Sequence, residues 1–430
     1  MSNSAFSIAR VATRAIAIAS IAIAGCSMHG IALGGAAAPA TTLTKAQDPD
    51  VPKHIVTMDW LGGSSGTRAV TWAQAAPHTT WAFTGAKDSV AIRAAGIETL
   101  YYTQPNRQAP GDPEYTTENS TFSHDCGGSR IVSTNFPSEN LMDPGSAELG
   151  QLWRAEVRTV TKSWGGVFNA IFEDLSDTIV YTSAPPCNFD QTTWSTRSNK
   201  LVTYVTGMGY PVFYNGLAVL SKNTDGTLGV SPTMALNENA AGGMFEGCYV
   251  TSGAYPLLHL NTWIATEETE IAMAAAGKYF LCEGLDDNLA AASIPARIYY
   301  YASLLMTYDP ATTIDISEFS TPRDFHVLPE TRFVPEDPLI AVTSTSQLVQ
   351  SGDVYGRQYA HCYLGQVDQG ACAVVVNIGL SKAGAFPWPG LYTRTLVPTG
   401  NDVYDGGSVS IQKVAPSSTM PALSAVIAVH

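Results

Sequence analysis

The sequence predicts an α/β protein in which a (β/α)8 TIM barrel is followed by a C-terminal antiparallel β-sandwich. Between residues 54 and 335, short apolar runs rich in β-forming residues alternate with longer helix-favouring stretches, the pattern of βαβ units and a parallel sheet. Beyond residue 335, turns rich in Gly and Pro separate alternating strands without an intervening helical stretch, which indicates a sandwich. The 430 residues suffice for a barrel of about 250 residues and an accessory domain.

Eight strands would close the barrel. We expect them at His78–Phe83, Thr99–Thr103, a weakly marked third near Phe122 or Arg130–Ser133, Val167–Asp174, Pro211–Asn215, Gly243–Glu246, Lys278–Cys282 and Leu304–Tyr308. Apolar positions three and four residues apart predict helices at Ala147–Thr161, Thr193–Met208 and Leu258–Ala276. Gly277 follows the last of these as a suitable left-handed cap.

The C-terminal domain, residues 336–430, is expected to contain five strands. They are Arg357–Leu364, Ala371–Asn377, Tyr392–Val397, Ser408–Lys413 and Ser424–Val429. Each is bounded by turn residues, and the repeated alternation predicts antiparallel pairing.

The first 25 residues are typical of a bacterial export signal. Arg10 and Arg14 give a basic start, and the apolar run Ala15–Ala24 is too short to span a bilayer. Small residues directly precede Cys26, as a lipoprotein signal peptidase requires, so we expect Cys26 to be the lipidated mature N-terminus. Ser27 favours sorting to the outer membrane, and the acyl chains would make the membrane a partner of the protein.

Two alternatives to lipidation remain open: an ordinary signal peptide cut near Ala36–Ala38, and an uncleaved anchor. Residues 26–53 include a long stretch rich in Ala, Gly, Thr and Pro without periodicity, and they are expected to form a flexible tether. The barrel would therefore begin near residue 54.

The composition suits a large core and an acidic surface. Hydrophobic residues make up 45% of the chain and charged residues 14%, and the formal net charge is −14. An acidic surface repels nucleic acid, and no basic stripe interleaved with aromatic residues occurs, so nucleic-acid binding is excluded as a function class.

Apart from Cys26 the chain has six cysteines, an even number in a compartment where disulfides persist. Sequence order suggests the pairs Cys126 with Cys187, Cys248 with Cys282, and Cys362 with Cys372, although six cysteines allow fifteen pairings. No Cys-x-x-Cys occurs and no two histidines have ligand spacing, so neither a metal site nor a cofactor is expected.

Three predicted strands end in carboxylates, where the strand ends of a barrel carry catalytic groups. The candidates for catalysis are Glu173, Asp174, Glu246 and Glu283. Glycosidic hydrolysis needs two carboxyl groups, one to protonate the leaving oxygen and one to attack the sugar or activate water. Because strand side chains alternate between faces, only one of Glu173 and Asp174 should face the barrel axis. Glu173 would lie on the same face as Asn169 and Ile171, which favours Asp174 as the inward residue. Glu246 has apolar neighbours, so we expect desolvation to raise its pKa and suit it to the acid role, with Glu283 in reserve.

Aromatic and amide side chains near the predicted strand ends are candidates for saccharide binding, since sugars present apolar faces and hydroxyls. They are Trp81, Tyr102, Asn106, His124, Asp125, Tyr214, Asn215 and Tyr249. Tyr214 with Asn215, directly after an apolar run, is the most specific pair.

Several short motifs resemble a group of bacterial glycoside hydrolases of TIM-barrel type. They are Ala95-Gly96-Ile97 through Tyr101-Tyr102-Thr103 to Pro105-Asn106, Leu141 to Ser146, Ile171 to Asp174, Phe245-Glu246-Gly247 and Val374 to Asn377, within about Trp72 to Asn377. The resemblance implies the barrel fold and, carried over by position, Asp174 and Glu246 as the acid pair. The Glu-Asp doublet stands where such a strand would end in aspartates, which leaves the partner residue open.

The sequence thus predicts a metal-independent glycosidase that acts on a polysaccharide near the cell surface. Two alternative functions remain open. Gly62 to Gly66 has Gly-x-Ser-x-Gly spacing around Ser64, but it lies near the mature N-terminus without the strand-to-helix context of a serine hydrolase. A noncatalytic saccharide-binding protein on a degenerate barrel is the stronger rival, because a fold does not dictate activity.

Overall fold

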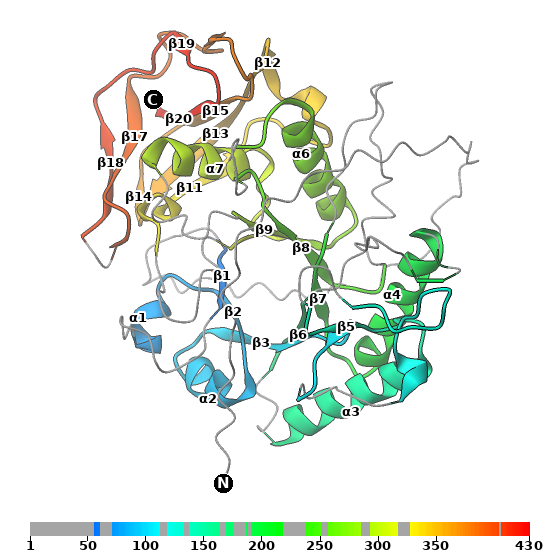
Figure 1. Ribbon diagram of the computed structural model, residues 1–430. Helices are drawn as coiled ribbons and strands as arrows, with labels where there is room; N and C mark the ends of the chain where they lie inside the picture. The colour runs from blue at the N-terminus through cyan, green and yellow to red at the C-terminus, as the bar shows by residue number, and fades with distance from the viewer. Residues whose placement is uncertain are drawn as a thin grey trace.

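The protein is described from a computed structural model (Figure 1). It describes residues 56–60, 71–111, 118–132, 137–163, 168–174, 186–187, 189, 191–217, 238–250, 257–284, 293–316, 327–403 and 406–430. The predictions for the export signal, Cys26, the tether and Ser64 lie outside the described residues. Within them, an α/β part built on a parallel sheet adjoins a C-terminal part built on antiparallel strands.

The main sheet has eight strands in the order β1-β2-β3-β6-β7-β8-β9-β10, and every neighbouring pair is parallel. Their bounds are β1 (Met58–Trp60), β2 (Trp81–Thr84), β3 (Glu98–Thr103), β6 (Ala170–Glu173), β7 (Val212–Asn215), β8 (Gly242–Glu246), β9 (Tyr279–Glu283) and β10 (Thr313–Ile316). The sheet curls until its two edge strands meet at one parallel bridge between Thr57 and Asp315. The α/β class and the curled parallel sheet are confirmed, but among the described residues this single bridge does not extend into the ladder of a fully closed barrel.

Helices connect most of these strands and cover the outside of the sheet (Figure 1). They are α1 (Trp72–Ala75), α2 (Ala86–Ala94), α3 (Ala147–Ser163), α4 (Gln191–Thr206), α6 (Leu260–Ala275) and α7 (Ile294–Thr307). α3 buries Leu149, Trp153 and Val157, whose four-residue spacing places them on one helix face. None of the helices in the described ranges is long and apolar enough to cross a membrane.

Two of the eight predicted strands are wrong. Leu304–Tyr308 falls at the end of α7, a helix buried on nearly every side, so its continuous apolar run resembles that of a buried strand. The third predicted strand belongs to an excursion between β3 and α3, where Phe122 and Val132 make only isolated bridges. The same excursion holds the short pair β4 (Arg107–Gln108) and β5 (Asn140–Leu141) and the 3-10 turn η1 (Asn119–Thr121). β1 and β10, which the sequence analysis missed, complete the set.

Side chains inside the curled sheet form a core separate from the one under the helices. The inner core contains Met58, Trp81, Phe83, Leu100, Ala170, Phe172, Phe213, Met244, Tyr279, Leu281, Ile314 and Ile316. Intervening residues of the same strands, such as Ile171, Tyr214 and Phe280, belong to the outer core against the helices. This strict alternation fixes which residue at each strand end faces inward.

The C-terminal part is antiparallel, as predicted. Its main sheet has the order β11-β13-β15-β20-β17-β18, with β12 and β14 also paired to β13. The strands are β11 (Phe333–Pro338), β12 (Val349–Ser351), β13 (Val354–Leu364), β14 (Val367–Asp368), β15 (Cys372–Asn377), β17 (Arg394–Thr399), β18 (Ser408–Gln412) and β20 (Ser424–Val429), with the 3-10 turns η3 (Pro329–Arg332) and η4 (Thr345–Gln347).

The predicted sandwich differs in its second layer. One face of the C-terminal sheet packs on α7, and Val374 and Val376 of β15 share the outer core with that helix. On the opposite face lie Trp388, Tyr392 and the two-stranded sheet of β16 (Gly384–Ala385) and β19 (Thr419–Met420). Phe386 and Met420 of this layer pack in one cluster with Val375. α7 therefore serves both parts of the molecule.

The three predicted disulfides are confirmed. Sulfur atoms are at bonding distance in Cys126–Cys187, Cys248–Cys282 and Cys362–Cys372. The first ties the excursion before α3 to the segment before α4, the second joins the ends of β8 and β9, and the third joins β13 to β15.

Candidate functional site

Polar side chains continue the inner face of the sheet at the carboxyl ends of its strands. Each lies two positions after an inner-core residue, so the alternation of strand side chains aims it at the barrel axis. They are Tyr102 after Leu100, Asp174 after Phe172, Asn215 after Phe213, Glu246 after Met244, and Glu283 after Leu281. We call Tyr102, Asp174, Asn215, Glu246 and Glu283 the rim cluster.

Asp174 directly follows β6 and is buried, with 6% of its surface exposed. Its Oδ2 accepts hydrogen bonds from the hydroxyl of Tyr102 and from Nε2 of Gln104 (3.1 Å), and its Oδ1 accepts one from Nδ2 of Asn215 (2.8 Å). Burial, followed by the charge of Asp174, raises the pKa of Tyr102 well above its usual range, so the phenol keeps its proton and donates it. Three donors thus stabilise negative charge on this carboxylate.

Asn215 connects the two carboxylates that the sequence analysis paired. Its Nδ2 lies 2.8 Å from Oδ1 of Asp174 and 3.1 Å from Oε2 of Glu246. Glu246 itself is exposed, so the predicted desolvation of its carboxyl is wrong: it stands at the last position of β8, above the core residues that were expected to cover it.

Glu283 is the buried carboxyl on the neighbouring strand. It pairs in register with Glu246, and only 1% of its surface is exposed. Burial, with the charges of Glu246 and Asp174, raises the pKa of Glu283 well above its usual range. The environment expected for Glu246 therefore belongs to Glu283.

The chain turns sharply between Glu246 and the outer core. Gly247 has φ 94° and Tyr249 φ 59°, both in the left-handed region. This turn lets the amides of Gly247 and Cys248 donate to the carbonyl of Glu283 at 2.9 and 2.6 Å. The Cys248–Cys282 disulfide joins the same two strand ends, so β8 and β9 are cross-linked directly beside Glu246 and Glu283.

Glu173 faces away from the rim cluster, as its parity predicts. It is fully buried on the outer side of β6, where Nδ2 of Asn106 donates to its Oε1 at 2.9 Å. Asn106 is 2% exposed, so this pair lies in the packed layer between the sheet and the excursion. Their assignment to catalysis and to saccharide binding is not supported by this position.

Three predicted aromatic platforms are buried where no sugar can stack. Trp81 begins β2 and fills the inner core at the opposite end of the strands. Tyr214 belongs to the outer core, where a Cβ on Gly243 would come within 2.7 Å of its ring. Tyr249 is fully buried against Trp263 and Tyr300. Burial explains all three, since large aromatic side chains commonly fill cores.

His124 and Asp125 lie on the excursion and are not part of the rim cluster. Oδ1 of Asp125 accepts the amides of Gly127 and Ser129, both at 2.8 Å, so this carboxylate caps a tight turn. Gln104 is the member of the site that the sequence analysis missed. It continues the inner parity of Leu100 and Tyr102 beyond the end of β3, and that parity could have identified it.

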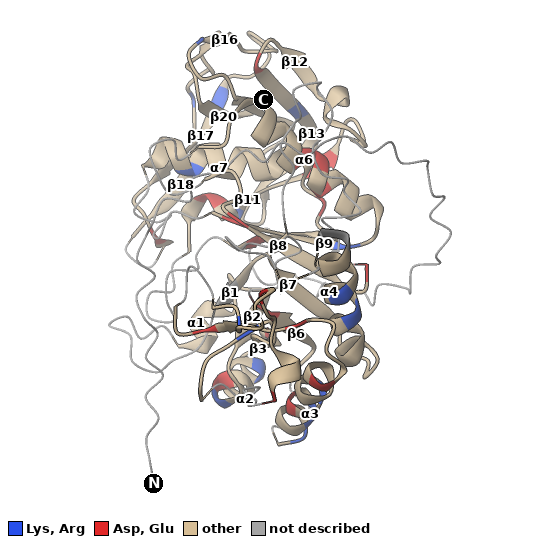
Figure 2. Ribbon diagram, turned by 45° about the vertical axis from the view of Figure 1, so that its right-hand side comes forward, with Lys and Arg blue, Asp and Glu red and all other residues tan. Residues whose placement is uncertain are grey.

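Charge is distributed unevenly over the α/β part. The outer helices α2 and α3 carry both basic and acidic residues and α4 carries Arg and Lys, whereas β6, β8 and β9 each end in Glu (Figure 2). Within the described ranges, no group of three or more His, Cys, Asp or Glu side chains is arranged to hold a metal ion.

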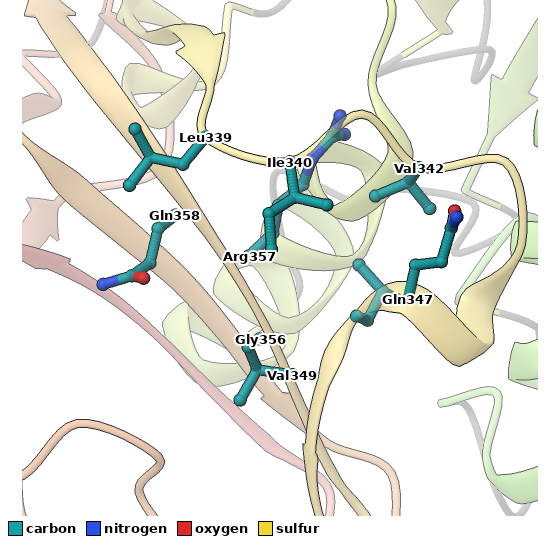
Figure 3. Close-up of a pocket in the computed structure, with 9 residues that line it drawn as sticks. Leu339, Ile340, Val342, Gln347, Val349, Gly356, Arg357 and Gln358 are labelled. Carbon is teal, nitrogen blue, oxygen red and sulfur yellow. The ribbon is translucent and has the colours of Figure 1, made fainter.

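A surface hollow in the C-terminal part offers a different environment. The segment after β11 lines it with Val342 and the exposed Leu339 and Ile340 (Figure 3). The other walls are Gln347 to Val349, from the end of η4 to the start of β12, and Gly356 to Gln358 of β13. Its nine lining residues include no carboxylate, so it cannot supply the paired acids of a glycosidase.

No family model and no curated protein matches the sequence, so the family resemblance stays a prediction. Solved structures that are similar include Ega3 of Aspergillus fumigatus in complex with galactosamine (11% identity, 64% of this chain and 95% of that chain, TM-score 0.40). The glycoside hydrolase domain of PelA from Pseudomonas aeruginosa (11%, 62% and 96%, 0.37) and the maltogenic α-amylase AmyB from Thermotoga neapolitana (8%, 87% and 98%, 0.43) are also similar. These neighbours are glycoside hydrolases, but similarity at this level does not decide the activity of this chain.

Proposed function

We propose that the protein is a glycoside hydrolase that cleaves a polysaccharide with Asp174 and Glu246. The observation that carries the proposal is the shared amide of Asn215, within hydrogen-bond distance of both carboxylates. Asp174, whose oxygens accept hydrogen bonds from three donors, is positioned to attack the anomeric carbon. Glu246, exposed at the rim, can reach the glycosidic oxygen and exchange its proton with water.

The geometry favours retention of anomeric configuration. Two oxygens that accept from one amide nitrogen lie on the order of 5 Å apart, the separation typical of retaining enzymes. In the first step the bond from Asp174 to the sugar forms as the glycosidic bond breaks, and Glu246 gives its proton to the leaving oxygen. In the second step Glu246 takes a proton from water, which displaces Asp174 from the sugar.

The acidic strand ends also constrain the substrate. The rim cluster contains acidic residues and no Lys or Arg that could bind a carboxylate, so it favours a neutral or positively charged saccharide over a uronic-acid polymer. The predicted export signal and the predicted lipidation of Cys26 support a location at the outer membrane, where such polymers are accessible.

The test is release of reducing ends from a panel of bacterial and plant polysaccharides. Wild-type protein is expected to release them, and Asp174→Asn and Glu246→Gln are each expected to lower the rate by about 10³-fold or more. Proton NMR of the first product would show the retained anomer. Saccharide binding without any release would instead favour a noncatalytic saccharide-binding protein, and labelling of Ser64 by a fluorophosphonate would favour a serine hydrolase.

A further inference from the structure

Glu283 is an exception among the members of the rim cluster. Its Oε2 is buried and has no hydrogen-bond partner among the residues that the structure describes. Buried carboxyl oxygens nearly always have partners, and leaving one without a partner is destabilising. At the edge of an acidic site, such an atom is a candidate to bind a partner that arrives with a ligand.

The surroundings of Glu283 identify what that partner can be. Glu246 and Asp174 face it from β8 and β6, and on the outer side the hydroxyl of Tyr300 on α7 donates to the carbonyl of Cys282 at 3.1 Å. Burial, with the charges of Glu246 and Asp174, raises the pKa of Glu283 well above its usual range, which favours the protonated carboxyl. A protonated carboxyl is a hydrogen-bond donor, and a sugar hydroxyl can accept from it.

We propose that Glu283 is a saccharide-binding residue whose uncharged carboxyl donates a hydrogen bond to a hydroxyl of the sugar ring held between Asp174 and Glu246. The inference rests on the saccharide site proposed above. It assigns Glu283 a role in binding rather than in proton transfer, which distinguishes it from its neighbour in register, Glu246.

Backbone geometry holds Glu283 in this place. The amides of Gly247 and Cys248 both bind its carbonyl, and the Cys248–Cys282 disulfide fixes the residue before it. The carboxyl therefore cannot easily turn toward water, where it would ionise. A donor fixed in position costs little ordering when the ligand binds.

The protonation state can be tested without any substrate. In protein labelled with carboxyl-13C glutamate, the resonance lost in Glu283→Gln belongs to Glu283. We expect it at the position of a protonated carboxyl at pH 7. An ionised Glu283 at that pH would overturn the proposal.

The binding role is tested on the same labelled protein with glucose, galactose, glucosamine, galactosamine and N-acetylglucosamine as probes. At least one is expected to shift the Glu283 resonance in Asp174→Asn as well as in wild type. Affinity for that probe should fall about tenfold in Glu283→Ala and stay within about threefold in Glu283→Gln, whose amide replaces the donor. Glu270→Gln, which alters another buried carboxyl, is the matched control and should leave affinity unchanged.

The outcomes separate this inference from the proposed function. If wild-type protein releases no reducing ends but a probe shifts the Glu283 resonance, the hydrolase is wrong and the binding residue stands. If hydrolysis depends on Asp174 and Glu246 while no probe shifts the Glu283 resonance, the binding role is overturned. Equal affinity of Glu283→Ala and wild type would overturn it as well.

Discussion

Glu270 and Glu283 are both buried carboxyl groups with raised pKa values, one on α6 and one at the end of β9. Both oxygens of Glu270 have partners: Thr313 donates to Oε1 at 2.6 Å, and Thr307 donates to Oε2 at 2.9 Å. Oε2 of Glu283 has none within the described part of the chain. Oε1 of Glu267, buried beside Glu270, also has no partner there, so neither burial nor an unpartnered oxygen marks a functional acid by itself. Glu283 is distinguished by its place at the inward-facing strand ends, in register with Glu246.

The two regions also differ in what they connect. Glu270, with the adjacent buried Glu267, lies where α6 and α7 meet, and the positive charge of Arg357 on β13 acts on both acids. This group therefore links the α/β part to the C-terminal sheet and stabilises the fold. The rim cluster lies at strand ends and does not link two parts of the fold. Substitutions in it should therefore change activity more than the free energy of unfolding.

The largest expected effect is on stability, and it compares the disulfide beside the rim cluster with the disulfide of the C-terminal sheet. Replacing Cys248 and Cys282 by Ser opens a loop of 34 residues, and replacing Cys362 and Cys372 opens one of 10. Chain entropy predicts losses of about 4 and about 3 kcal/mol in unfolding free energy, measured by urea denaturation.

Only the first pair adjoins Glu246 and Glu283, so only its loss should lower hydrolysis, by about tenfold. Equal activity of the two double variants would show that the cross-link between β8 and β9 does not position the acids.

Glu270→Ala should reduce stability without reducing hydrolysis. The change removes three hydrogen bonds, from Thr307, Thr313 and Tyr249, although Thr307 keeps Glu267 as an acceptor. At about 1 kcal/mol each, their loss costs about 3 kcal/mol of unfolding free energy. Reducing-end assays below the unfolding temperature should give the wild-type rate. A large loss of rate in the folded variant would place Glu270 in the site and remove the contrast.

Asn215→Ala should reduce hydrolysis with little loss of stability. Without the shared amide, Asp174 and Glu246 lose the common donor that positions both carboxyl groups, so hydrolysis should fall by about 10- to 100-fold. Unfolding free energy should change by only about 1 kcal/mol. An active Asn215→Ala variant would mean that the amide is not needed to hold the carboxylates.

The smallest expected effect is the pH dependence of stability. Burial raises the pKa of Glu270 to about 7, so the folded state binds more protons than the unfolded state between about pH 4.5 and 7. The contribution of Glu270 to stability is therefore full below about pH 4.5 and is lost as pH rises through 7, with a slope of up to about 1.4 kcal/mol per pH unit. Urea denaturation over this range should show a shallower decline for Glu270→Gln than for wild type, and parallel curves would contradict the assignment.

Parity explains why part of the site was predictable from sequence. An apolar strand that ends in an acid reveals its inward residue once the alternation is followed, which selects Asp174 over Glu173 and places Asn215 beside it. The cysteine pairs followed from sequence order because each joins neighbouring elements.

Burial was harder to predict than direction. Trp81, Tyr214 and Tyr249 are the aromatic residue types that bind sugars, but all three lie in cores. Helices packed from elsewhere in the chain cover Tyr214 and Tyr249, and the curling of the sheet encloses Trp81. Leu304–Tyr308 was expected to be a strand because a helix covered on two sides, by the α/β part and by the C-terminal sheet, loses its amphipathic pattern. Tertiary packing, not local preference, decided these cases.

The central claim, that inward-facing acids at the ends of β6, β8 and β9 bind and cleave one sugar chain, is tested most directly by a crystal structure of Asp174→Asn with a bound oligosaccharide. A sugar ring between residue 174 and Glu246, with a hydroxyl within hydrogen-bond distance of Oε2 of Glu283, is the predicted result. An oligosaccharide bound only in the aliphatic hollow at Leu339 and Ile340, with the strand ends empty, would contradict it.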